Sequence, residues 1–237
     1  MKIFVTGCCG YIGSHTSVEL LNNGYEVVLT REPGGKGLGE KVREILLNYD
    51  GEVSNRCESF LFLADRAQNI DIIVNPAIEQ GKIVLCDRHT DSSVAYQGYG
   101  RGLDINQINT LNNLATNNQK PDLTLVFDVD IETSMQRVGN EKDRMESAGK
   151  DFFNRVRNGY LELAKQEPER IKVIDSTKSI EENIKSADEK LYEANRKSQF
   201  LSGLMQPIMM FVGNLGYVAV SVVGGYLAIQ GRITVGN

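Results

Sequence analysis

The stretch IVLCDRHTDSSVAYQGYGR, residues 83–101, decides the fold that we expect for this chain. Its first four residues are apolar and predict a buried strand, which gives way abruptly to Asp87 and Arg88. Two hydroxyls, a phenol and an amide follow within two helical turns: Ser92, Ser93, Tyr96 and Gln97. Ligands bind at the carboxyl ends of strands in open α/β sheets, where an Arg can bind a phosphate and an Asp a metal. The stretch therefore predicts a ligand site, against the alternative of a capped strand–loop–helix connection with a surface ion pair.

Length and charge limit the classes of protein that need to be considered. The 237 residues suffice for one large α/β domain, or for one domain and an appendage. A net charge of −5 provides no overall basic field, so we expect no nucleic-acid partner. The four cysteines show no metal-ligand spacing and predict reduced thiols, and the chain opens without a secretory signal. These features predict a cytoplasmic protein.

The chain opens with a strand–turn–helix–strand pattern. Residues 2–6 predict a short buried strand, residues 12–23 a helix and residues 25–30 a second strand. The turn before the helix, GCCGYIGS, contains three glycines and a serine: Gly7, Gly10, Gly13 and Ser14. Free N–H groups and the helix dipole favour an anion there, so we expect these four residues to bind the phosphates of a cofactor. A turn that needs glycine only for close packing of strand and helix is the alternative.

Residues 1–28, MKIFVTGCCGYIGSHTSVELLNNGYEVV, resemble the first unit of UDP-glucose 4-epimerase and other extended short-chain dehydrogenases. The resemblance implies a Rossmann-like opening in which the loop holds the pyrophosphate of NAD. Two features of that family are missing. Arg31 stands where an acid would bind the ribose hydroxyls, and the chain has no Tyr-x-x-x-Lys pair to supply the catalytic base. NAD is therefore a secondary hypothesis for the cofactor.

Strands and helices alternate along the rest of the chain. Apolar spacing predicts helices at 37–48, 57–79, 104–116 and 151–165, and strands at 83–86, 121–130 and 171–176. The strand at 121–130 ends in two acids, Asp128 and Asp130, and a charged, lid-like stretch follows it. Alternation of this kind predicts a parallel sheet covered by helices on both faces, which is a three-layer α/β fold.

Residues 26–191 carry seven motifs in a fixed order: TREPGG, LADRAQ, CDRHTDSSVAYQGYGRG, PDLTLVFDVD, KDRME, FFNRVRNGYLELAK and RIKVIDS. In this order and spacing they resemble thymidylate kinase, a nucleoside monophosphate kinase of the P-loop fold. The resemblance covers most of the chain and implies transfer of a phosphoryl group from ATP, with Mg²⁺, to thymidine monophosphate. Such transfer needs positioning and charge stabilisation more than covalent chemistry, which suits a cluster of Arg side chains and one Asp.

The resemblance to the kinase family also implies a role for each matching side chain. Arg88, Asp87 and Arg144 would be catalytic, with Arg88 on the acceptor phosphate, Asp87 near Mg²⁺ and Arg144 in the lid. The substrate pocket would be formed by Glu32, Pro33, Arg43, Phe62, Arg66, Ser92, Ser93, Tyr96 and Gln97. Within this set, the two arginines would reach toward the phosphate, Phe62 would stack on the base, and the last four residues would read the base. For each residue alone, a surface charge or ordinary helix packing is the alternative.

One motif of the kinase family is absent. A P-loop kinase has G-x-x-x-x-G-K-[ST] after its first strand, and the Lys neutralises the donor phosphates while the hydroxyl holds Mg²⁺. Here GCCGYIGSH occupies that place, and no Lys follows the glycines, although Ser14 could supply a hydroxyl. We therefore expect the acceptor site to be better preserved than the ATP site, and turnover to be weak or absent.

The last part of the chain differs from the rest in composition. Residues 198–231 contain no Asp, Glu, Lys or Arg, and residues 203–229 exceed the roughly 20 residues that cross a bilayer. From about residue 193 to 237 the sequence resembles one transmembrane helix of a multidrug-type ABC exporter, without an ABC signature motif. We expect a helical, apolar tail that associates with a membrane or another hydrophobic surface; a hairpin buried in a protein core is the alternative.

The three resemblances meet at two boundaries, near residues 27 and 192. The first boundary falls inside a βαβ unit, whereas domain boundaries normally fall in linkers. We therefore interpret the chain as a recombined or artificial chimera, with a kinase-like α/β domain at 1–191 and a tail at 192–237. A chimera without activity is the alternative to an impaired kinase. The sequence leaves the oligomeric state open, a homodimer included.

Overall fold

The computed structural model describes residues 11–137, 149–179 and 181–193, together with Met210, Asn214, Val223 and Gln230. The chain divides into two compact units, Met1–Ala194 and Asn195–Asn237. Nearly all of the second unit lies outside the described residues, so the tail expected over 192–237 stays a prediction. No helix within the described ranges is long and apolar enough to span a membrane. The apolar span expected at 203–229 belongs to the part that is not described, apart from three single residues.

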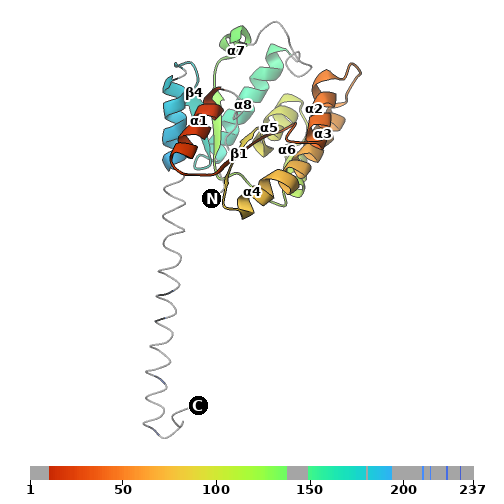
Figure 1. Ribbon diagram of the computed structural model, residues 1–237. Coiled ribbons are helices and arrows are strands. Elements are labelled where there is room, and N and C mark those ends of the chain that lie inside the picture. The colour runs from red at the N-terminus through yellow and green to blue at the C-terminus, as the bar shows by residue number, and fades with distance from the viewer. Residues whose placement is uncertain are drawn as a thin grey trace. The chain divides into compact units, whose positions relative to one another are not determined.

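Helices and strands alternate along the first unit, as the sequence predicts (Figure 1). The helix expected at 57–79 consists of three continuous segments, the second of which is a π-helical turn. Residues 181–193 are also helical. The elements are α1 (Tyr11–Asn22), β1 (Val27–Arg31), α2 (Leu38–Asn48), α3 (Asn55–Asn69), η1 (Ile70–Val74), α4 (Asn75–Glu79), β2 (Ile83–Asp87), α5 (Thr90–Ser93), η2 (Val94–Gly100), α6 (Ile105–Ala115), β3 (Thr124–Asp128), α7 (Ile131–Arg137), α8 (Lys150–Gln166) and β4 (Ile171–Asp175).

The described strands form two parallel pairs. β1 pairs with β2 from Val27↔Ile83 to Arg31↔Asp87, and β3 pairs with β4 from Thr124↔Ile171 to Asp128↔Asp175. The parallel pairing that we predicted is confirmed for these four strands, while the strand expected at residues 2–6 lies outside the described residues. Each pair ends level at its carboxyl edge, so Asp87 and Asp128 stand at the last position of their strands.

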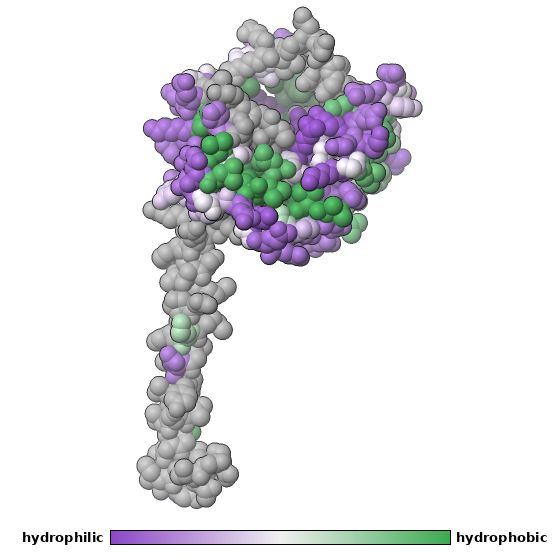
Figure 2. Space-filling model, viewed as in Figure 1, coloured by the Kyte–Doolittle hydropathy of each residue, from purple (hydrophilic) through white to green (hydrophobic). Residues whose placement is uncertain are grey.

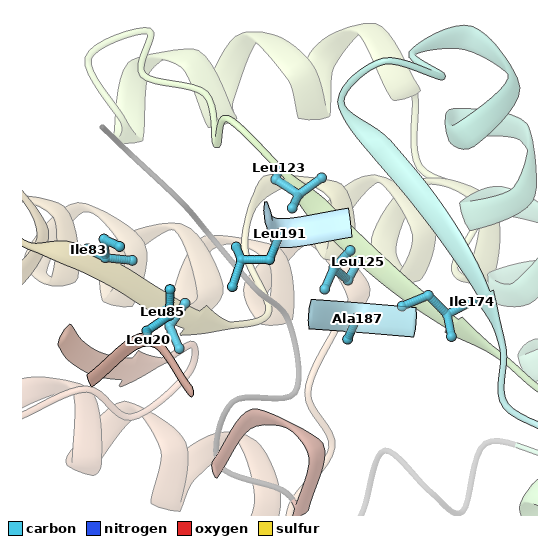
Figure 3. Packing of buried hydrophobic residues seen from close by; sticks show 8 residues of the cluster. All are labelled: Leu20, Ile83, Leu85, Leu123, Leu125, Ile174, Ala187 and Leu191. Atoms are coloured by element: carbon cyan, nitrogen blue, oxygen red, sulfur yellow. The ribbon is translucent and has the colours of Figure 1, made fainter. Parts of the chain in front are cut away.

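Both faces of the strands are covered by helices, which makes three layers. Alternate residues of β2 point to opposite faces, as the period of a strand requires. One cluster combines Leu85 of β2 with Leu125 of β3, Leu20 of α1 and Leu191 of the last described helix (Figure 3). The other face of β2 packs on the segment from η1 to α4, through Ile70, Val74, Ala77, Val84 and Cys86. Because the first cluster includes residues of both strand pairs, the two pairs share one core.

Helix α1 buries polar residues and exposes apolar ones. Thr16 is fully buried, and its hydroxyl donates to Asp188 Oδ1 at 3.2 Å. Val18 and Leu21, in contrast, are 54% and 55% exposed, and of the apolar residues of this helix with a described side chain only Leu20 is in the core. Apolar residues also reach the surface on the face shown in Figure 2. The described side chains of α1 thus contribute one apolar residue to the core.

We expect Leu20→Ala to lower the free energy of unfolding by about 2–5 kcal/mol, because it empties a position in the shared core. Leu21→Ala is the matched control on the same helix, and its exposed site predicts a change within about 0.5 kcal/mol. Urea unfolding of the two variants measures both values. Equal losses would show that α1 packs in a different orientation from the one described.

Candidate functional site

Eight side chains that the sequence predicts for the site line one pocket. They come from four segments: the turn after β1, helix α3, the loop after β2, and the helical turns α5 and η2 that follow it. The lining residues are Glu32, Phe62, Arg66, Arg88, Ser92, Ser93, Tyr96 and Gln97. The fold therefore brings together side chains that are up to 65 positions apart in the sequence (97 − 32).

A buried ion pair forms the base of the pocket. Arg66 Nε donates to Glu32 Oε2 at 2.7 Å, and both side chains are almost completely buried. The other donors of Arg66 reach Ser93 Oγ at 2.8 Å and Asn112 Oδ1 at 2.6 Å. The second oxygen of Glu32 accepts from Asn69 Nδ2 at 3.0 Å. This network connects the turn after β1 with helices α3, α5 and α6.

The partners of Glu32 keep it ionised. Burial by itself would raise the pKa of Glu32, but the charges of Arg66 and His89, with hydrogen bonds from His89 and Asn69, outweigh it and lower the pKa to about 2. His89 Nδ1 lies 3.2 Å from Glu32 Oε1. The carboxylate is therefore negative at any physiological pH and balances the charge of Arg66.

Arg88 provides an accessible cation at the mouth of the pocket. It follows the last residue of β2 with a φ of 66°, in the left-handed region that a non-glycine residue adopts at a cost. The residue as a whole is exposed, and its guanidinium carbon lies 4.6 Å from the centre of the Tyr96 ring, with which the guanidinium also forms a hydrogen bond. Stacking on an aromatic face leaves the N–H edge of a guanidinium available for an anion.

The two serine hydroxyls of the pocket are acceptors of protein hydrogen bonds. Tyr160 Oη, on helix α8, donates to Ser92 Oγ at 2.7 Å, and Arg66 Nη1 donates to Ser93 Oγ. A hydroxyl has one proton of its own to donate, in addition to its lone pairs. Both serines can therefore donate that proton to an acceptor on a ligand.

Other predicted residues lie near the pocket without lining it. Pro33 is buried and follows a cis peptide bond after Glu32. Arg43 Nη1 donates to the Pro33 carbonyl at 3.1 Å and so supports the turn after β1, and its expected contact with the phosphate stays a prediction. Asp87 is half-buried at the end of β2, and its carbonyl accepts the N–H of Glu32 at 2.8 Å.

Part of the predicted site lies outside the described residues. This applies to Arg144, Gly7 and Gly10. Gly13 and Ser14 lie in the first turn of α1, where the backbone is described. The expected contacts of these five residues with a cofactor stay predictions.

One buried group has the donor atoms of a metal site. Single atoms of Glu32, Cys86 and His89 all lie within 4.8 Å of one another, in the part of the chain that the structure describes. However, Asn69 Nδ2 donates to Glu32 and lies 3.8 Å from Cys86 Sγ, and the Arg66 guanidinium contacts the same carboxylate. A metal cation would have to displace these donors and would stand beside a buried positive charge. The group is therefore a hydrogen-bonded network that does not suit a metal.

Two carboxylates at the carboxyl edge of the strands differ in their suitability for Mg²⁺. Asp128 receives Arg157 Nε at 2.6 Å and Nη2 at 2.8 Å, one on each oxygen. Asp87 stands at the equivalent position of β2, next to Arg88. Mg²⁺ in such sites uses one or two carboxylates together with substrate phosphates. At Asp128, Mg²⁺ would have to displace Arg157 from both carboxylate oxygens.

Asp65 is a buried acid behind the turn after β1 that sequence reasoning missed. Its Oδ1 accepts the N–H of Gly34 at 3.1 Å, and a Cβ on Gly39 would lie 2.5 Å from the same oxygen. Its Oδ2 has no hydrogen-bond partner among the described residues. Burial raises the pKa of Asp65 to about 7, against the lowering effect of the Gly34 N–H.

Several other residues of the site were not found from the sequence. Tyr160, Asn69 and Asn112 lie on helices whose spacing indicates only ordinary packing, and their contacts depend on how those helices are placed. His89 directly follows Asp87 and Arg88, so its neighbours were a usable signal. Glu58 lies in the first turn of α3, where an acid is expected for the helix dipole alone.

A three-layer parallel α/β fold with an arginine and a pocket at a strand end is typical of nucleotide-binding phosphotransferases. Comparison with known proteins identifies the family: the thymidylate kinase model matches residues 15–187, and the chain belongs to that family. The chain is 44% identical to a thymidylate kinase of Desulfovibrio desulfuricans, over 73% of this chain and 86% of that protein. It is 47% identical to one of Kosmotoga olearia, over 71% and 85%.

A solved structure agrees with this assignment. The crystal structure of thymidylate kinase from Ehrlichia chaffeensis superposes with a TM-score of 0.59 and 37% identity, covering 73% of this chain and 92% of that one. The kinase match begins at residue 15, inside α1, and so extends further toward the N-terminus than the 26 that we expected. This is compatible with a shared strand–helix–strand pattern in both kinds of βαβ opening.

A second family model, the ABC transporter transmembrane region, matches residues 169–237. It covers less than half of the chain and overlaps the kinase match over 169–187, which includes β4. These matches do not test the epimerase resemblance of residues 1–28 or the chimeric origin, and both stay predictions.

The raised pKa of Asp65 predicts a pH-dependent effect of Asp65→Asn. In the unfolded chain the acid ionises near 3.8, whereas in the fold it ionises near 7. The contribution of Asp65 to stability therefore falls as pH rises from about 4 to 7, by up to roughly 4 kcal/mol. Asparagine keeps an acceptor for Gly34 and has no charge, so we expect Asp65→Asn to stabilise at pH 8 and to change little at pH 4.

Urea unfolding at both pH values measures this effect. Asp71→Asn is the control, because Asp71 is exposed nearby on η1. A stability difference between Asp65→Asn and the original chain that stays constant from pH 4 to 8 would contradict the assignment of a buried, strained acid.

Proposed function

We propose that the chain binds thymidine monophosphate in the pocket around Arg88 and transfers a phosphoryl group to it from ATP, slowly because of its first loop. The observation that supports the acceptor half is the pocket itself. Eight side chains predicted from the kinase resemblance line it, and they come from four separate segments. The observation that supports slow transfer is the sequence GCCGYIGSH, which has no Lys.

The chemistry of the lining suits a nucleoside monophosphate. Arg88 is exposed at the strand end and can bind the phosphate through its N–H edge. Phe62 offers an aromatic face to the base. Ser92 and Ser93 have their own protons left to donate, and the carbonyl oxygens of thymine can accept them.

The part of the proposed site that would bind ATP has less positive charge than a P-loop kinase provides. Transfer from ATP needs cations on the phosphate oxygens, because the transition state spreads negative charge over them. Asp87 would hold Mg²⁺, which neutralises part of that charge when it is bound with ATP. We expect the glycine turn before α1 to present N–H groups to a phosphate, but no lysine follows the glycines there. We propose that this missing charge limits turnover.

The alternative is the same acceptor pocket in a chain without turnover. The distribution of residues on α1 favours it, because exposed Val18 and Leu21 and buried Thr16 indicate a helix that does not match this sheet. A chimeric origin of residues 1–28 would explain that mismatch. The two hypotheses, slow turnover and no turnover, differ in whether restoring the G-x-x-x-x-G-K-[ST] loop restores phosphoryl transfer.

Titration calorimetry with thymidine monophosphate tests the acceptor site. We expect measurable binding to the full chain and an approximately 10–100-fold weaker Kd in Arg88→Ala, because a charge-assisted contact to phosphate is lost. Arg56→Ala is the matched control at an exposed arginine of α3 outside the pocket. If the original chain binds none of the nucleotide, or if Arg56→Ala weakens binding as much as Arg88→Ala, the proposed site is wrong.

Two substitutions would rebuild the missing motif. Ile12→Gly with Gly13→Lys converts residues 7–14 to G-x-x-x-x-G-K-S. We expect ATP-dependent phosphorylation of thymidine monophosphate to rise by at least about 100-fold over the original chain, the scale of one charge stabiliser in a transition state. A coupled assay for ADP release measures it.

The control for this experiment carries Ile12→Gly with Gly13→Gln, which has the length of the side chain without its charge. Equal rates in the two double variants would show that the charge is not what limits turnover. A high rate in the original chain would contradict the proposed impairment directly.

A further inference from the structure

We infer that Glu58 is a specificity-determining residue of the acceptor pocket, because it fixes the direction in which the Gln97 amide faces a bound base. The inference rests on the proposed binding of thymidine monophosphate. Glu58 does not line the pocket, and it acts through Gln97, which does. It is therefore a positioning residue that does not contact the nucleotide.

Glu58 is a rigidly held anion. It lies in the first turn of α3 and is 1% exposed. Arg101 donates from Nε to Glu58 Oε1 at 3.2 Å and from Nη2 to Oε2 at 3.1 Å, which engages both oxygens in a fork. Arg101 is itself fixed from the other side, since its guanidinium carbon lies 4.6 Å from the centre of the Phe152 ring. Neither partner can rotate without breaking this pair.

The carboxylate also accepts a hydrogen bond from the pocket residue. Gln97 Nε2 donates to Glu58 Oε1 at 3.3 Å, and the Gln97 side chain is 1% exposed. An ionised carboxylate can only accept, whereas an amide has one donating and one accepting end. The NH₂ end of Gln97 must therefore face Glu58, and its carbonyl oxygen is left for a ligand in the pocket.

This orientation selects between bases of similar size. Thymine presents an N3–H donor between two carbonyl oxygens, whereas cytosine has an unprotonated N3 and an amino group at position 4. A Gln97 carbonyl can accept the N3–H of thymine but finds only an acceptor at N3 of cytosine. Hydroxyl protons from Ser92 and Ser93 suit the thymine carbonyls. A buried polar group left without a partner penalises the wrong base.

A merely structural role of Glu58 makes a different prediction. If the Glu58–Arg101 pair only stabilises the contact between α3 and η2, its loss weakens the binding of every nucleotide by the same factor. If Glu58 orients Gln97, its replacement by an amide changes the ratio of two affinities. A glutamine at position 58 can donate or accept, so the Gln97 amide could then adopt either direction.

The test compares thymidine and deoxycytidine monophosphate on the full chain by titration calorimetry. We expect the original chain to prefer the thymidine nucleotide, and Glu58→Gln to reduce that preference by about tenfold, the scale of one hydrogen bond. Glu167→Gln is the matched control, because Glu167 forms a similar forked pair with Arg170 away from the pocket. The control should leave the preference unchanged.

Glu58→Gln leaves the Arg101 charge without its carboxylate and could prevent folding, so a second variant is needed. Glu58→Gln with Arg101→Gln replaces both charges, which is far less costly than removing one partner. We expect the same loss of preference in the double variant. An unchanged preference in whichever of these variants folds overturns the inference.

The outcomes also separate this inference from the proposed function. If the original chain binds neither nucleotide, the proposed function fails, and the role of Glu58 fails with it. If the original chain binds both with equal affinity, acceptor binding stands and the role of Glu58 is wrong.

Discussion

The acceptor pocket depends on one buried interaction, the ion pair between Glu32 and Arg66. Moving such charges out of water costs several kcal/mol for each ion, and the attraction between them offsets this only when their remaining polar atoms are also bonded. Here Asn69, Ser93 and Asn112 provide those bonds. Loss of one partner would leave an uncompensated charge, at a cost of about 3–5 kcal/mol. The relative positions of β1, α3, α5 and α6 around the pocket are thus set by electrostatics as well as by apolar packing.

The same pair determines where the pocket has positive charge that is not balanced by a carboxylate of its lining. Among the side chains that line the pocket there are two arginines and one carboxylate, which leaves a net charge of +1. Glu32 neutralises Arg66 at the base, so the unbalanced positive charge belongs to Arg88 at the mouth. The left-handed backbone of Arg88 is a conformation that persists only where surrounding structure determines it, and such residues are concentrated at functional sites. We had assigned Arg66 to the phosphate as well, but its donors are already directed at Glu32, Ser93 and Asn112.

The sequence was sufficient for the parts of the structure that depend on local pattern. Apolar runs ending in polar residues located β2 and β3, and their alternation with helices predicted parallel pairing, as the ladder from Val27 to Arg31 confirms. The resemblance to the kinase family implied every residue that lines the pocket. It did not indicate which of these side chains would form hydrogen bonds or ion pairs with other residues of the protein. Tyr160 and Ser92 are 68 positions apart, and no periodicity shows that the phenol on α8 donates to that serine. Glu58 and Asp65 look like ordinary helix acids until burial is known.

The two halves of the proposed reaction site are determined by separate parts of the chain. All the contacts described for the pocket join residues from Thr30 onward, through Asn69, Asn112 and Tyr160. Helix α1 contributes Leu20 to the core and Thr16 to a bond with Asp188, and both lie away from the pocket lining. The hydrogen bonds and ion pairs described for the pocket therefore do not involve the described residues of α1. The proposed acceptor site in the stretch after β2 can thus be tested separately from the proposed ATP site before α1.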